Sequence, residues 1–257
     1  MNGTFDILSS LSPALPLVLI RTGGIFLAAP ALAEPVVPVR LRVLLAVVLA
    51  LAAAGRVALP AGPMSDGAFL AAAAGELLVG ATIGLAAAVV LSGVELGAFH
   101  ISQQMGLSLS QVFDPVTAQG GDPVRRLLVL LAVVVFLAVG GHTMMLSALL
   151  GSFESVPVGS VLAAGRATDL IVALLGASFV LGLKVAAPVL AAMLLATVAL
   201  GLLQKTLPQC NILTVGLPTR ALLGLALLGI AAAALGYLVE AATDLVGRHL
   251  ATWALQA

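Results

Sequence analysis

The stretch Phe69–Leu96, FLAAAAGELLVGATIGLAAAVVLSGVEL, decides the fold class of this chain. It carries two charged residues, Glu76 and Glu95, and shows no strand-like alternation of polar and apolar side chains. A helix crosses the hydrocarbon core of a bilayer with about 20 mainly apolar residues. The sequence therefore predicts a transmembrane helix over this stretch.

Five further apolar runs lie around this stretch: Pro13–Ala33, Leu41–Leu59, Leu127–Leu150, Leu170–Leu203 and Ile212–Val239. The chain is 61% hydrophobic and 9% charged, with a mean hydropathy of +1.22. A soluble domain has about a quarter of its residues charged, so this composition excludes a soluble protein. We expect an all-α, polytopic membrane protein with about six hydrophobic helical segments. Pro188 makes the fifth run either a bent helix or two shorter pieces.

Charge and ligand-forming residues exclude several classes of function. Eleven Lys and Arg balance eleven Asp and Glu, which leaves no basic surface for nucleic acid. A single Cys210 and three widely separated histidines do not have the spacing of a metal site. No catalytic constellation is visible. We therefore expect a non-enzymatic protein with no catalytic residues, no metal and no cofactor.

A polar segment interrupts the apolar runs between Leu96 and Leu127. Non-helical backbone persists at membrane depth only where protein buries it or water wets it. Glycine can adopt backbone conformations that other residues resist, and Asp-Pro favours a turn. Apolar side chains can close a narrow aqueous path by dewetting. The sequence therefore predicts a re-entrant central loop and a gate, with a plain loop bound to neighbouring subunits as the alternative. The candidate gate residues are Gln104, Met105, Gly106, Leu107, Val112, Phe113, Asp114 and Pro115.

Four ionisable residues lie inside the apolar runs or at their ends: Arg21, Glu76, Glu95 and Lys184. An Arg or Lys at the centre of a membrane helix costs about 2.5–3.5 kcal/mol, so such groups face a bundle interior, a partner subunit or water. We interpret the four as buried or assembly-related ion pairs. A proton or ion pathway that uses Glu76 and Lys184 is the alternative.

Two glycine pairs in the same region have a spacing of four residues, Gly80 with Gly84 and Gly93 with Gly97. Small residues at this spacing share one helical face and let a second helix approach closely. The pattern is equally compatible with packing inside the chain and with assembly between subunits.

Several ordered motifs together resemble the flagellar biosynthesis proteins of the FliR type and their injectisome counterparts, the R/T component of the type III secretion export gate. The resemblance runs over most of the chain, although Asp122, Arg125 and Arg126 make the end of the central loop more charged than the family pattern. The motifs are Arg21–Phe26 with Ala29-Pro30, Pro38–Val43, Glu76–Gly80, Gln104–Leu107, Phe113–Pro115, Gly141-His142, Lys184–Pro188, Pro208–Ile212 and Gly216–Pro218.

This resemblance implies a subunit that assembles with P- and Q-type membrane proteins into a helical export gate. The gate lies in the bacterial inner membrane within the flagellar basal body, contacts a large export-gate subunit and passes unfolded proteins. Residues 1–169 would form a P-like portion with a plug loop at 104–124, and residues 170–257 a Q-like hairpin and tail. The hairpin turn would be shaped by Pro208, Gln209, Asn211, Gly216 and Pro218.

Two questions stay open at the level of sequence. A small-molecule secondary transporter with a broken helix near Lys184 and Pro188 is the alternative function. Such transporters have paired helix breaks in two repeated halves, and no convincing repeat of this break is visible in the first half. Flagellar and injectisome use are not distinguished by any local motif.

Overall fold

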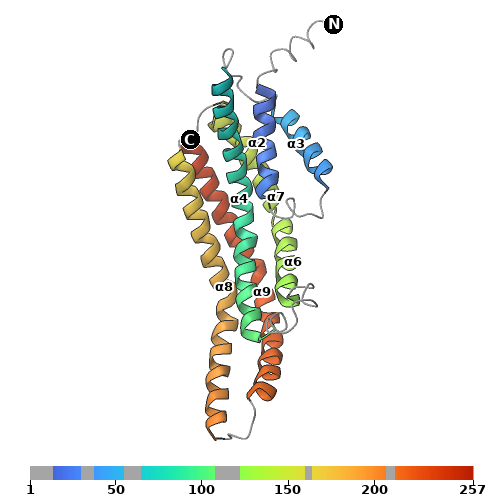
Figure 1. Cartoon of the computed structure of the whole chain (residues 1–257), viewed down its shortest axis with the longest axis vertical. Coiled ribbons are helices and arrows are strands. Elements are labelled where there is room, and N and C mark those ends of the chain that lie inside the picture. The colour runs from blue at the N-terminus through green and yellow to red at the C-terminus, as the bar shows by residue number, and fades with distance from the viewer. Residues whose placement is uncertain are drawn as a thin grey trace. The chain divides into compact units, whose positions relative to one another are not determined.

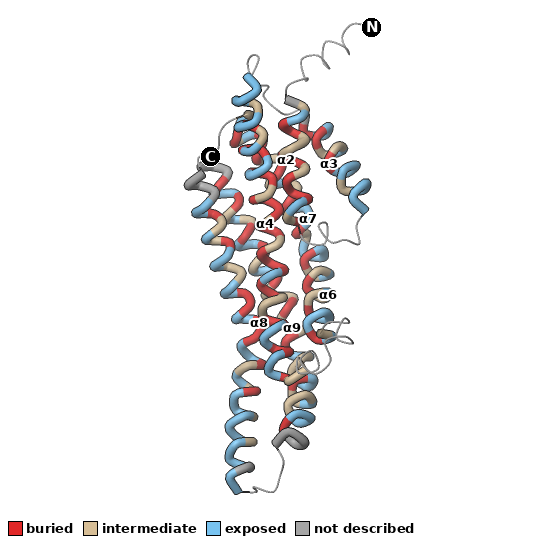
Figure 2. Tube along the Cα trace, viewed as in Figure 1, coloured by how far each residue is buried: buried red, intermediate tan, exposed pale blue. Residues whose placement is uncertain are grey.

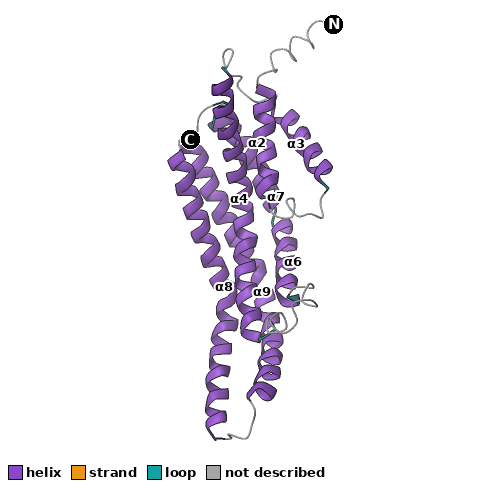
Figure 3. Cartoon of the chain, viewed as in Figure 1, coloured by secondary structure: helices purple, strands orange, loops and turns teal. Residues whose placement is uncertain are grey.

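The computed structural model describes residues 14–29, 38–54, 65–107, 122–159, 164–206 and 212–256. Every regular element in these ranges is a helix (Figure 3), which confirms the all-α prediction. In chain order the helices are α2 (Ala14–Ala28), α3 (Val39–Ala54), α4 (Asp66–Met105), α6 (Pro123–Ala138), α7 (Gly141–Ser155), α8 (Ala164–Thr206) and α9 (Ile212–Gln256) (Figure 1).

Each of the six apolar runs forms helix over nearly all of its described residues. The fourth run is divided into α6 and α7, which are bent by 57° at a short break. The residue before α7 is Gly140, whose φ of +87° favours glycine because other side chains are strained there. This bent pair is either a broken span or a re-entrant segment. Residues 108–121 of the central polar loop, in which the re-entrant segment was predicted, lie outside the described residues.

Fewer helices are long and apolar enough to cross a membrane than the six apolar runs suggested. Among the described residues, three stretches are long and apolar enough to cross a bilayer, or four if the bent pair α6 and α7 counts as one. The apolar part of α2, Leu15–Ala28, is shorter than a full crossing. The three long stretches are Asp66–Met105, Thr168–Leu203 and Gly216–Trp253.

The structure decides one boundary that the sequence left open and corrects two others. Helix α8 runs continuously through Pro188, so the two shorter pieces are not found and the break behind the transporter alternative is absent. Helix α4 continues to Met105, so the predicted loop begins later than expected. Pro218 lies inside α9 and not in the hairpin turn. A proline ring fixes φ near the helical value, and membrane helices tolerate the one hydrogen bond that it removes.

The chain divides into two compact units, each built from separate stretches of the sequence. Unit 1 comprises Met1–Val89, Gly140–Leu175 and Thr243–Ala257, and unit 2 comprises Val90–Val139 and Gly176–Ala242. Helices α4, α8 and α9 therefore each contribute residues to both units.

In unit 1, the first half of α4 packs directly against α2. A Cβ added to Gly84 would lie 2.5 Å from the Ile25 carbonyl oxygen, and one added to Gly80 would collide with the Arg21 carbonyl. Leu17 and Ile25 of α2 are fully buried, and Figure 2 shows buried residues along both α2 and α4. Glycine therefore brings the two backbones together, and the pair Gly80 and Gly84 packs within the chain.

In unit 2, the second half of α4 packs in the same manner against α8. A Cβ on Gly97 would lie 2.7 Å from the Gly182 carbonyl oxygen, and one on Gly182 would lie 2.8 Å from the Gly93 carbonyl oxygen. Burial is uneven among the long helices: within their most apolar 18 residues, 67% of α4 but 22% of α8 and of α9 is buried. Most of the apolar surface of α8 and α9 thus faces away from the chain.

Candidate functional site: a buried ion pair and the two anchored ends of the polar loop

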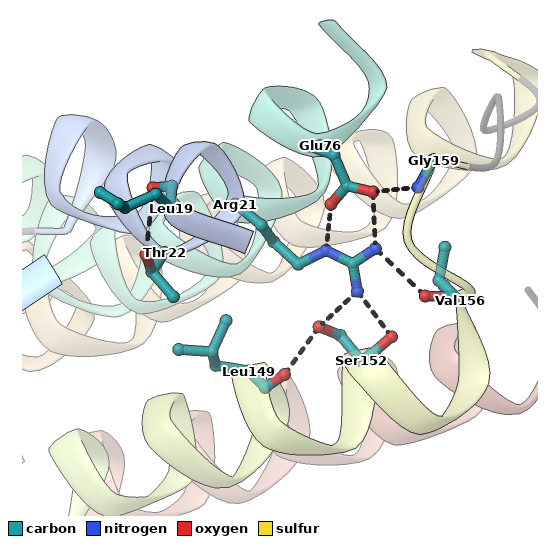
Figure 4. A network of polar contacts seen from close by, with 8 residues as sticks. All are labelled: Leu19, Arg21, Thr22, Glu76, Leu149, Ser152, Val156 and Gly159. Carbon is teal, nitrogen blue, oxygen red and sulfur yellow. Dashed lines mark hydrogen bonds and ion pairs between the residues drawn. The ribbon is translucent and has the colours of Figure 1, made fainter. Parts of the chain in front are cut away.

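A fully buried ion pair joins α2 to α4 in unit 1 (Figure 4). The Nε of Arg21 donates to Oε2 of Glu76 at 2.5 Å, and its Nη2 donates to Oε1 at 3.1 Å. The side chains of Arg21 and Glu76 are 0% and 1% exposed. This two-point geometry is the strong form of an arginine–carboxylate contact.

The remaining polar groups of the pair bind α7 and the turn after it. Nη1 of Arg21 donates to the backbone oxygen of Ser152 at 2.8 Å and to its Oγ at 3.3 Å, and Nη2 also donates to the Val156 oxygen at 3.1 Å. The Gly159 N–H donates to Oε1 of Glu76 at 2.9 Å. The guanidinium carbon lies 4.5 Å from the centre of the Phe153 ring, within range of a cation–π interaction.

This arrangement meets the requirements of a buried charge. A buried ion pair is tolerated when its geometry is good and further hydrogen bonds satisfy its remaining protons and lone pairs. Arg21 donates to Glu76, Ser152 and Val156, so both charges are held by several segments at once. The ion pair and its hydrogen bonds connect α2, α4 and α7, and we call this network the buried clamp.

A second ion pair joins α4 to the first turn of α6 in unit 2. Nη2 of Arg125 donates to Oε1 of Glu95 at 2.5 Å. Both side chains are 45% exposed, so Glu95 is not the buried residue that the sequence suggested. The N-terminus of α6 is capped by Asp122, whose Oδ1 accepts from the backbone N–H groups of Val124 and Arg125 at 3.0 and 3.2 Å. Cap and ion pair together fix the point where the polar loop ends.

The beginning of the polar loop is fixed by packing. Met105, the last residue of α4, is fully buried. It fills the space above Gly224 of α9, where any Cβ would collide with its side chain. Gly106 follows with φ +78°, and its N–H donates to the Gln103 oxygen at 3.1 Å. A flexible methionine on a glycine thus ends α4, and a glycine in the left-handed region turns the chain.

The other predicted site residues are placed as follows. Gln104 is exposed in α4, and Leu107 is half-buried. Lys184 is exposed on α8 rather than buried. Gly216 is buried and Pro218 exposed, both in α9. Outside the described residues lie Val112, Phe113, Asp114, Pro115, Pro208, Gln209 and Asn211.

The sequence did not identify which residues contact Arg21, Glu76, Glu95 and Met105. Ser152 and Gly159 bind mainly through backbone atoms, which any residue type supplies, so no sequence signal points to them. Gly224 is one of 27 glycines and stands in no distinctive motif. Arg125 did have a signal, because its charge departs from the family pattern, but nothing in the sequence links it to Glu95.

Known proteins are similar to this chain over most of its length. Flagellar biosynthetic protein FliR of Bacillus subtilis (strain 168) is 27% identical over 223 residues, 86% of this chain and 85% of its own. The protein of the same name from Escherichia coli (strain K12) is 29% identical over 219 residues, 82% and 80% of the two chains. That of Pectobacterium carotovorum subsp. carotovorum is 35% identical over 137 residues, about half of each. Residues 13–246 match the family described as bacterial export proteins, family 1, and this chain therefore belongs to that family.

Proposed function

We propose that this chain is a non-enzymatic subunit of a flagellar export apparatus in the bacterial inner membrane. With P- and Q-type membrane proteins it forms the pore through which unfolded proteins leave the cell, above a large export-gate subunit. Family membership and relatives named flagellar biosynthetic protein FliR support this proposal. Three long apolar helices, or four with the bent pair, are in keeping with a multi-pass membrane subunit.

The polar loop at residues 104–124 acts as the plug of this pore in our proposal. The observation that carries it is the path of the chain in unit 2. The loop leaves α4 at Met105, and Arg125 then contacts Glu95, which precedes Met105 by ten positions on α4. At 1.5 Å per residue, the side chain of Arg125 thus contacts α4 about 15 Å back along the helix that the chain left.

A returning segment with both ends anchored suits a plug. The anchors at Met105 and at Glu95–Arg125 hold its two ends on one helical unit. Leu107, Val112 and Phe113 supply apolar bulk, which closes a narrow aqueous path by dewetting. In the division that the resemblance implies, residues 1–169 carry this loop and residues 170–257 form the hairpin that packs against other subunits.

Assembly is tested by co-expressing the chain with P- and Q-type proteins of its own genome and measuring native mass spectra. A defined mixed complex that contains this chain is expected. A chain that stays alone beside both proteins would refute the proposed function and return attention to a self-contained transporter.

The plug is tested in the assembled complex by deleting Leu109–Phe113. Ion conductance of the complex in planar bilayers should rise, because the apolar closure is lost. A matched control deletes five residues, Val57–Ala61, from the connection between α3 and α4. Unchanged conductance in an intact complex that lacks Leu109–Phe113 would refute the plug.

A further inference from the structure

The middle of α8 carries a single charged side chain on its outward face. Lys184 is the only charged residue between Asp169 and Lys205. It is exposed, and in the part of the chain that the structure describes no carboxylate pairs with it. Glu76 and Glu95, the two glutamates of α4, are engaged by Arg21 and Arg125 instead.

The position of Lys184 along α8 makes lipid an unfavourable neighbour. The apolar stretch runs from Thr168 to Leu203, and every 20-residue crossing taken within it includes Lys184. A lysine near the centre of a membrane helix is costly to insert, and such residues face a bundle interior, a partner or water. Acyl chains supply no anion, so lipid tails leave this cost unrelieved.

Pro188 removes one backbone hydrogen-bond donor at the same place. Proline has no N–H, so the backbone oxygen of Lys184 lacks the donor that position 188 would otherwise provide in a continuous helix. Membrane helices tolerate such a freed carbonyl where a neighbouring helix, a polar side chain or water satisfies it. One turn of α8 therefore offers both a cation and a hydrogen-bond acceptor.

The surface around Lys184 has the shape of a helix contact. Val180 and Leu195 are 51% and 72% exposed at its two ends, and the exposed Ala187 and Ala191 lie between them. Small residues at a spacing of four allow a second helix to approach closely. An aqueous path is lined by several polar groups, whereas the side chains that flank this lysine are apolar.

We propose that Val180, Lys184, Ala187, Ala191 and Leu195 form a docking surface for a membrane helix of another subunit, and that an aspartate or glutamate of that helix pairs with Lys184. Charge complementarity selects this occupant, because a carboxylate at the same depth satisfies the lysine within an apolar contact. That the partner is a subunit of the export apparatus rests on the proposed function.

The contact is tested by photo-crosslinking in membranes of cells that also express the P- and Q-type proteins. A photoreactive amino acid at position 184 is expected to capture one partner subunit, and mass spectrometry of the adduct locates the contacted helix. The control position is Phe179, which is 66% exposed and lies about 140° around α8; it should not give the same adduct. Capture of lipid alone at position 184, in an assembled complex, would overturn the proposal.

The ion pair is tested by reversing the charge. Lys184→Glu should lower the yield of the complex at least tenfold, Lys184→Arg should retain it, and a Lys in place of the contacted acidic residue should rescue Lys184→Glu. The separately purified Lys184→Glu chain should keep its melting midpoint, since Lys184 has no carboxylate partner within the described chain. Complex formation by Lys184→Glu at the normal level would refute the ion pair and indicate a water-facing lysine. Failure of the unsubstituted chain to assemble would refute the proposed function instead.

Discussion

Removing the charge of Glu76 tests the buried clamp most directly. Glu76→Gln keeps the size of the side chain but leaves Arg21, which is 0% exposed, without a counter-charge. Breaking a buried ion pair by removing one partner costs about 3–5 kcal/mol, because the remaining charge stays desolvated. The contacts of Arg21 with the backbone oxygens of Ser152 and Val156 remain, so we expect a loss at the lower end of this range, about 3 kcal/mol.

The chain offers its own reporter for this measurement. Trp253 is the sole tryptophan, is buried, and belongs to unit 1 together with the clamp. Its fluorescence during denaturation in a mild detergent gives the free energy of unfolding of wild-type and variant chains. Glu154→Gln is the matched control, because Glu154 lies on α7 in the same unit but is exposed. It should change the free energy by less than about 0.5 kcal/mol.

A double substitution separates the ion pair from the rest of the network. Arg21→Met with Glu76→Gln removes both charges, so the double variant should be more stable than the sum of the single losses predicts, by up to about 3 kcal/mol. It should still be less stable than wild type, because the Gly159 N–H and the Val156 oxygen lose their charged partners. A loss below about 1 kcal/mol for Glu76→Gln, or strict additivity, would refute the clamp.

Three further substitutions test packing and backbone geometry. Gly140→Ala should destabilise the chain by about 1–2 kcal/mol because its φ is +87°, whereas Gly151→Ala, with open space around it in α7, should be neutral or stabilising; thermal melting compares the two. Gly80→Val should sharply reduce the yield of monodisperse chain in size-exclusion chromatography, because a side chain there collides with the backbone of α2; a normal elution profile would contradict the close contact. Met105→Ala should cost about 2–5 kcal/mol through the cavity left above Gly224, and an unchanged melting midpoint would argue against this packing.

The fold class could be predicted from the sequence because hydrocarbon offers the backbone no hydrogen-bond partners. Backbone groups inside a bilayer must be paired within their own segment, so long apolar runs such as Phe69–Leu96 had to be helical. The same reasoning singled out Arg21 and Glu76, since charges in such runs require partners. The motifs around the central loop and the last two runs indicated the family, which the match over residues 13–246 confirms.

The ends of the helices were less predictable from the sequence than the presence of the helices. The polar composition after Leu96 suggested an early end to α4, yet the helix continues to Met105 because Met105 packs onto α9. Pro188 left a bent helix and two shorter pieces open, and α8 is continuous through it. Glutamine and proline do not by themselves end a long membrane helix. Contacts with the rest of the chain therefore contribute to where such a helix ends.

Only the tertiary structure decided which residues meet. A helix that is apolar all round has no inward face that periodicity can identify, so nothing in the sequence indicated that Glu76 faces Arg21 while Lys184 faces outward. The chain by itself determined which side chains need partners, through the cost of leaving charge in hydrocarbon. Helix packing, which Gly80 and Gly97 allow to be close, determined which of those side chains find a partner within the described chain.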